Sequence, residues 1–264
     1  MPSLTSARVP ARPVAVARVM LGVATMMIAV EGQDISQSIV DGRVATPVAG
    51  WLPSPEQLGA YPFVLTVLAG LLIALGVGTR WWAAVVVVCE LAVMLSDLQL
   101  YSNHRVLLVL VMTALVLARS DTALAPGARH RRGQTVPWWP QLLMLASVSS
   151  CYLFAGISKI NPEWWGGSQL DDLRLVELSG LPLHGLAAAT VLTEITIGIG
   201  LWFRRSRGVA VALGIGLHTS ICLTLTAPFV FVAFALICFS AYPLALNRPD
   251  LADLASDEAP PVVV

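Results

Sequence analysis

Charged residues are scarce in this sequence. Only 12% of the 264 residues are charged, about half the share found in soluble globular chains, whereas 56% are hydrophobic. The mean hydropathy is +0.76. Because 16 basic and 16 acidic residues cancel, we expect neither a basic nucleic-acid binder nor a highly charged disordered chain. The composition predicts an integral membrane protein.

Lysine is almost absent, since fifteen of the 16 basic residues are arginine and Lys159 is the remaining one. Cysteine is sparse as well. The four cysteines lie within apolar runs, without the paired spacing of a disulfide framework or a metal site, and are Cys89, Cys151, Cys222 and Cys238. We interpret them as small hydrophobic residues and expect no metal.

Long apolar runs are abundant. A helix that spans a membrane needs about 20 mostly apolar residues, and eight segments approach that length: 13–29, 62–77, 81–98, 106–118, 140–157, 183–203, 208–225 and 229–246. We predict an all-α fold, a polytopic bundle of about eight transmembrane helices over residues 13–246. A cytoplasmic segment, 1–12, would precede it, and a disordered acidic tail, 247–264, would follow.

The first apolar segment is also compatible with a signal peptide. Cleavage needs small residues after the apolar run, but Glu31-Gly32-Gln33-Asp34 comes next. We therefore expect a retained helix, followed by a loop over residues 31–61.

The basic residues divide unevenly between the loops of such a bundle. With an inner N-terminus, twelve lie inside: Arg8, Arg12, Arg18, Arg80, Arg119, Arg129, Arg131, Arg132, Arg204, Arg205, Arg207 and Arg248. Four lie outside: Arg43, Arg105, Lys159 and Arg174. Because positive residues favour the cytoplasmic side, we predict cytoplasmic termini, a plasma-membrane location and extracytoplasmic loops over 31–61 and 159–182.

Ionisable residues within spanning segments mark candidate sites, because each is costly unless paired or hydrated. Glu90 or Glu194 is expected to neutralise Arg18 in a structural pair between helices, and the sequence leaves open which one does. His218 is either a buried neutral histidine held by a hydrogen bond or a functional group.

Lys159 shares a helix face with Tyr152 and Gly156, which lie seven and three residues before it. Gly156 allows the close approach of a neighbouring helix. One interpretation of Lys159 is an anchor at the membrane edge, beside Trp164. The other is a general base, because a desolvated amine can give up its proton whereas a guanidinium cannot.

Four stretches, taken in order, carry a resemblance to a known family. They are Arg18-Val19-Met20-Leu21-Gly22; Ser102-Asn103-His104; Tyr152-Leu153-Phe154-Ala155-Gly156-Ile157-Ser158-Lys159 with Trp164 and Gly166-Gly167; and Leu217-His218 with Pro228-Phe229. Together they resemble the HTTM family, the integral-membrane part of vitamin K-dependent gamma-carboxylase. The matching order covers residues 8–246, nearly the whole chain.

The resemblance implies that Lys159 is the base that deprotonates a reduced quinone of the vitamin K or menaquinone type, and that His104 assists. In the carboxylase, the quinol then reacts with oxygen, the strong base formed removes a proton from a substrate glutamate, and carbon dioxide adds. The resemblance also implies a set of residues that line the quinone site: Tyr152, His218, Asn103 and Trp164.

The sequence also departs from the carboxylase. We expect no counterpart of the large lumenal domain that presents the glutamate, and Ser158 stands where the carboxylase has a second lysine. Besides membrane lipid, we therefore expect a secreted peptide or a small partner protein that supplies the missing domain, and no nucleic acid.

Two classes of function remain open. The first is a quinol-dependent membrane enzyme that modifies a secreted peptide or small substrate. The second is a non-catalytic maturation, chaperone or immunity partner of an exported peptide. A transporter is less expected, because the sequence has no clear internal repeat.

Overall fold

The chain folds into the predicted all-α bundle. The computed structural model describes residues 7–249, except 43, 127, 129–133, 167–180 and 225–227. Its helices are α1 (Ala11–Val40), α2 (Pro55–Leu58), α3 (Tyr61–Leu75), α4 (Thr79–Ser96), α5 (Asn103–Leu117), α6 (Trp139–Ser158), α7 (Pro162–Trp165), α9 (Leu181–Gly200), α10 (Arg207–Thr224), α11 (Pro228–Phe239) and α12 (Tyr242–Leu246). Two 3-10 turns, Leu98–Leu100 and Ser120–Thr122, and two short strands, β1 (Arg8–Pro10) and β2 (Thr135–Pro137), complete the described part.

Each of the eight predicted apolar segments coincides with helix in the structure. Six stretches are long and apolar enough to cross a membrane: Ala11–Val40, Thr79–Ser96, Trp139–Ser158, Leu183–Gly200, Arg207–Thr224 and Phe229–Leu246. α3 and α5 are apolar but shorter, with 15 residues each. The exact number of spans therefore stays a prediction. The last predicted segment is divided, because α11 ends at Phe239 and α12 begins at Tyr242.

The predicted loop that begins at Glu31 is wrong over its first ten residues, because α1 continues to Val40. Ile28, Ile35 and Ile39 follow one another at helical spacings of seven and four residues, so the packed face of α1 extends past Glu31. Ile35 and Ile39 pack in a small cluster with Phe63. At 1.5 Å per residue, the 30 residues of α1 measure about 45 Å, which exceeds the thickness of a bilayer's hydrocarbon core.

The segment before α1 is tied to the bundle. β1 pairs antiparallel with β2, and Val9 lies opposite Val136 in the register. Both valines are buried in the main core. The predicted domain boundary at residue 13 stays a prediction, and the acidic tail lies outside the described residues beyond Arg248 and Pro249.

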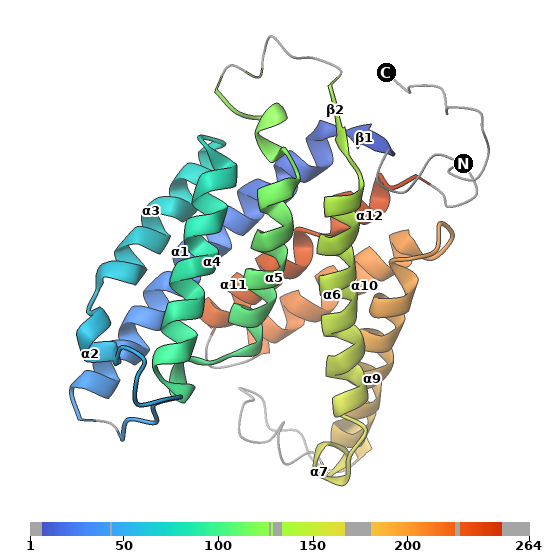
Figure 1. Ribbon diagram of the computed structural model, residues 1–264. Coiled ribbons are helices and arrows are strands. Elements are labelled where there is room, and N and C mark those ends of the chain that lie inside the picture. Colours follow the sequence, from blue (N-terminus) through green and yellow to red (C-terminus); the bar gives the residue numbers. More distant parts are fainter. Residues whose placement is uncertain are drawn as a thin grey trace.

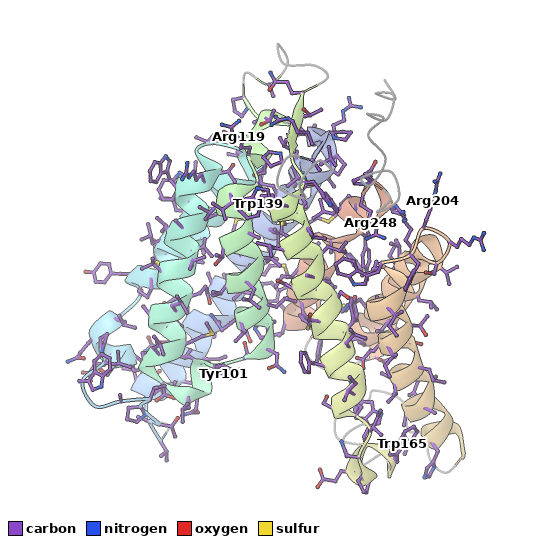
Figure 2. All side chains as sticks on the ribbon, turned by 45° about the vertical axis from the view of Figure 1, so that its right-hand side comes forward. Tyr101, Arg119, Trp139, Trp165, Arg204 and Arg248 are labelled. Carbon is purple, nitrogen blue, oxygen red and sulfur yellow. The ribbon has the colours of Figure 1, made fainter. Side chains whose placement is uncertain are left out.

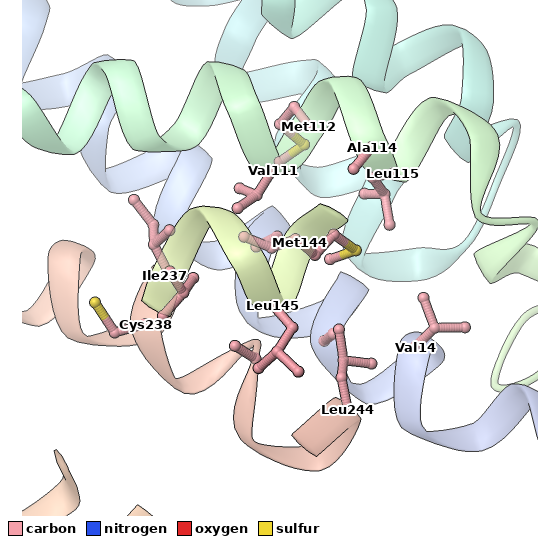
Figure 3. Packing of buried hydrophobic residues seen from close by; sticks show 14 of the residues in the cluster. Val14, Val111, Met112, Ala114, Leu115, Met144, Leu145, Ile237, Cys238 and Leu244 are labelled. Carbon is pink, nitrogen blue, oxygen red and sulfur yellow. The ribbon is translucent and has the colours of Figure 1, made fainter. Parts of the chain in front are cut away.

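α1 lies at the centre of the helix packing. It contacts α3, α5, α11 and α12, while α6 packs against α5 on one side and α9 on the other (Figure 1). The core consists of aliphatic side chains from α1, α5, α6 and α11–α12, as Figure 3 shows for Val14, Met112, Leu145, Ile237 and Leu244.

The two ends of the bundle differ in composition. β1 and β2 lie at one end, and α2 and α7 lie at the other (Figure 1). Figure 2 shows Arg119, Arg204 and Arg248 near the β1–β2 end, and Tyr101 and Trp165 near the opposite one. We call the first the arginine end and the second the lysine end, because Lys159 follows α6 there. Which end faces the cytoplasm stays a prediction.

α1 and α3 approach each other closely at Gly22, and a substitution there can test this contact. A Cβ at Gly22 would lie 2.6 Å from both the Gly70 carbonyl oxygen and the Ala74 nitrogen of α3. Because these are backbone atoms, the helices themselves have to separate. We expect Gly22→Ala to lower stability by about 1–3 kcal/mol, measured by thermal unfolding in detergent.

Gly216→Ala in α10 is the matched control, since no atom lies within 4 Å of a Cβ at that position. Its unfolding temperature is expected to equal or exceed that of the parent chain. Equal unfolding temperatures for the two variants would contradict the packing described for α1 and α3.

Candidate functional site

Lys159 forms an ion pair with Glu194. Its Nζ donates to both carboxylate oxygens of Glu194 at 2.7 Å and to the Ala155 carbonyl at 3.3 Å. Glu194 lies in the second half of α9, which approaches α6 closely because Gly156 packs against Ile195 and the Val191 carbonyl. The Lys159 side chain is 21% exposed and that of Glu194 is 9% exposed. The pair is thus mostly buried, and the lysine is the more exposed of the two partners.

Trp164 covers this pair from α7. The predicted helix end at Asn161-Pro162 takes a definite form: α6 ends at Ser158, and the Asn161 side chain accepts a hydrogen bond from the Trp164 nitrogen, which starts α7. The Lys159 ammonium lies 5.1 Å from the centre of the Trp164 ring. Trp164 is buried, and its indole nitrogen donates to the Ala187 carbonyl of α9. Such a contact between a cation and an aromatic face is favourable.

Tyr152 and His218 bind each other deeper in the bundle. The Tyr152 hydroxyl lies 2.7 Å from His218 Nε2 and 2.7 Å from the Tyr242 hydroxyl. His218 also makes edge contacts with the rings of Phe234 and Phe239. Seven helical residues separate Tyr152 from Lys159, a rise of about 10 Å along α6. Their predicted contact with a quinone stays a prediction, and the Tyr152 hydroxyl and His218 Nε2 already have protein partners.

His104 belongs to a second charged cluster, at the first turn of α5. Its Nε2 lies 2.9 Å from Glu31 Oε2 and 3.1 Å from the Ser102 hydroxyl. Arg105, fully buried beside it, donates to Glu90 at 2.7 Å and to the Ile28 carbonyl at 2.9 Å. Its Nη2 is also 3.4 Å from Glu31 Oε2. One guanidinium faces two carboxylates here, so a proton on His104 would balance the charge.

Arg18 pairs with neither glutamate, so the expected pair with Glu90 or Glu194 is wrong. Glu90 is held by Arg105, and Glu194 is held by Lys159. The buried Arg18 guanidinium instead donates to backbone carbonyls of four residues on two other segments: Ala74, Ser120, Ala123 and Leu124. The spacing of residues in the sequence does not predict these partners, because the backbone carbonyls come together only in the folded chain.

The structure thus groups the predicted site residues in pairs. Lys159 meets Trp164, and Tyr152 meets His218. His104 contacts neither pair, and Asn103 is exposed at the start of α5.

Three functional-site neighbours were missed by the sequence reasoning: Glu31, Arg105 and Tyr242. The isoleucine spacing beyond Ile28 could have placed Glu31 on a helix. Arg105 could have been recognised as the first-turn neighbour of His104. No comparable signal exists for Tyr242, whose hydroxyl occupies the space left by the missing side chain of Gly214.

These features define a helical membrane protein whose buried charges are paired across helices. A family model, described as HTTM domain, matches residues 8–244. The chain belongs to the HTTM family, and HTTM is the transmembrane domain of vitamin K-dependent gamma-carboxylase. It is therefore a multi-pass membrane protein. Comparison with curated proteins and with solved structures gave no match.

Replacement of Arg105 tests whether the second cluster holds its helices together. Arg105→Met leaves the buried Glu90 carboxylate without its partner, and we expect a loss of about 3–5 kcal/mol of stability. In the double variant Arg105→Met/Glu90→Met both charges are gone, so thermal unfolding in detergent should show a smaller loss than for Arg105→Met alone. A double variant less stable than Arg105→Met would refute this account.

Proposed function

We propose that this protein is a membrane enzyme in which Lys159, positioned by Glu194, accepts a proton from the hydroxyl of a reduced quinone. The observation that carries the proposal is the Lys159–Glu194 pair, with Nζ 2.7 Å from both carboxylate oxygens and the lysine side chain partly exposed. Membership of the HTTM family supports the choice of a quinol as substrate.

The proton balance of the pair is compatible with a base. An ammonium cannot accept a proton, but the proton shared between Nζ and the carboxylate can move to the Glu194 oxygen and leave a neutral amine. The amine then takes the quinol proton, so that the pair as a whole gains one. A general base must be unprotonated before it can accept a proton. A lysine amine can reach that state in a protein, whereas an arginine guanidinium cannot.

The residues around Lys159 fit a hydroquinone. A hydroquinone offers two hydroxyl groups on a flat ring, and this corner offers an amine, a carboxylate and the indole ring of Trp164. When bound, the quinone would supply the redox chemistry, because it can give up electrons to oxygen. The protein groups would hold its ring and receive the hydroxyl proton.

For His104 we propose a supporting role. It shares one oxygen of Glu31 with the Arg105 guanidinium, so it can keep a proton near the lysine end without carrying a net charge into the bundle.

The substrate that we propose is a secreted peptide or a small molecule, carboxylated at the extracytoplasmic face of the plasma membrane. Support for this side comes from the twelve-to-four distribution of basic residues, because the positive-inside rule puts the arginine end in the cytoplasm. Lys159 and His104 then face outward, where an exported peptide can reach them. A small partner protein would present it.

A non-catalytic partner of an exported peptide is the second candidate. The observation in its favour is that the Glu31, Glu90, His104 and Arg105 side chains bind one another, as a purely structural network requires. In that case the Lys159–Glu194 pair would only hold α6 to α9.

The enzyme proposal predicts that Lys159→Arg abolishes turnover although it conserves charge. In nanodiscs with reduced menaquinone and oxygen, quinol oxidation followed by chromatography should fall by roughly a hundredfold or more, the usual contribution of a general base. Intact-mass analysis of co-expressed secreted peptides should show an added carboxyl group that Lys159→Arg removes.

Ser158→Ala is the control, since Ser158 is the exposed neighbour and its hydroxyl bonds only to the Ala155 carbonyl of its own helix. It is expected to retain full activity. Full activity in Lys159→Arg would exclude Lys159 as the base. Absence of quinol oxidation and of peptide modification in the parent chain would favour the non-catalytic candidate.

A further inference from the structure

A pocket opens at the arginine end, far from Lys159 along the bundle. It has a volume of about 290 Å³ and is lined by Arg80, Val116, Leu117, Arg119 and Asp121. Arg80 is in the first turn of α4, the two apolar residues end α5, and Arg119 and Asp121 belong to the turn that follows. Figure 2 shows Arg119 at this end.

The pocket has an excess of positive charge. Asp121 interacts electrostatically with Arg18, the buried guanidinium beneath the turn. Within the described part of the chain, Arg80 and Arg119 form no salt bridge. Two exposed guanidinium groups are therefore left to attract an anion.

The turn that carries Arg119 is held in a fixed shape. Arg119 and Leu124 both have a φ of 50°, which is uncommon for residues with a side chain. Between them, Arg18 binds the carbonyls of Ser120 and Ala123. A strained turn that a buried arginine holds in place can point to a binding role.

The segments that frame the pocket contain buried polar atoms without a partner. Among the described residues, the hydroxyls of Thr79 and Ser120 and the Nε of Arg18 are buried and make no hydrogen bond. Thr79 directly precedes Arg80, and Ser120 directly follows Arg119. Buried polar groups are nearly always satisfied, so two unpaired hydroxyls adjacent in sequence to the pocket's arginines are compatible with a polar ligand there.

We propose that this pocket binds the phosphate headgroup of an anionic phospholipid. The planar guanidinium fork matches phosphate oxygens. The surroundings favour a lipid over free phosphate: Trp81, beneath the Arg80 guanidinium, is exposed, as are Leu117 and Leu124. Basic pockets between transmembrane helices are typical sites for anionic headgroups, and tryptophan is enriched at this depth.

The test compares lipid binding by two double variants of the full chain in detergent. Phosphatidylglycerol should bind the parent and raise its unfolding temperature, whereas phosphatidylcholine and inorganic phosphate at equal concentration should not. Arg80→Gln/Arg119→Gln should raise the apparent Kd for phosphatidylglycerol, measured by native mass spectrometry, by about tenfold, the equivalent of one charged hydrogen bond.

Arg204→Gln/Arg205→Gln removes the same charge at the same end and should leave that Kd unchanged. If Arg80→Gln/Arg119→Gln does not fold, the Kd of each single variant, Arg80→Gln or Arg119→Gln, is compared with that of the parent chain instead. Equal losses in both double variants would reduce the effect to general electrostatics and overturn the proposal. Stabilisation by inorganic phosphate equal to that by phosphatidylglycerol would overturn the assignment to a lipid.

Discussion

The guanidinium of Arg18 joins three segments that are distant in sequence. From α1 it donates to the last turn of α3 and to the turn after α5. Inside an apolar bundle no water is at hand for carbonyls at helix ends, so a side chain has to satisfy them. Arg207 does the same for Ala245 at the end of α12, whereas Arg105 binds the Ile28 carbonyl within α1. The five donors of a guanidinium suit this task, which gives the excess of arginine a structural reason.

Lys159 differs from these arginines in what it binds. Its ammonium meets a carboxylate bidentately and only one carbonyl, and it is more open than the buried guanidinium groups. Arg18, Arg105 and Arg207 serve the scaffold, because each directs donors at backbone carbonyls and Arg105 also at a buried glutamate. Lys159 therefore differs from Arg18 and Arg207 in that its main partner is a carboxylate and not a set of backbone carbonyls.

The helices were predictable because each spanning segment is a continuous apolar run. Lys159, Tyr152 and His218 were selected because the stretches that resemble the family contain them, and their roles stay predictions. The pairing of charges was not predictable in the same way. The sequence left both Glu90 and Glu194 open as partners of Arg18, and the choice of partner depends on which helices pack together. α1 is also longer than the apolar segment that predicted it, because Ile35 and Ile39 continue its packed face among polar neighbours.

The separation of the two charged clusters limits how they can act together. His104 opens α5 and Lys159 closes α6, and these helices pack side by side, so both groups lie at the lysine end. Each is already bound to its own glutamate, Glu31 or Glu194. No side-chain contact connects the two clusters among the described residues, so a proton cannot pass directly between them. Joint action of Lys159 and His104 would therefore need a group that carries the proton from one cluster to the other.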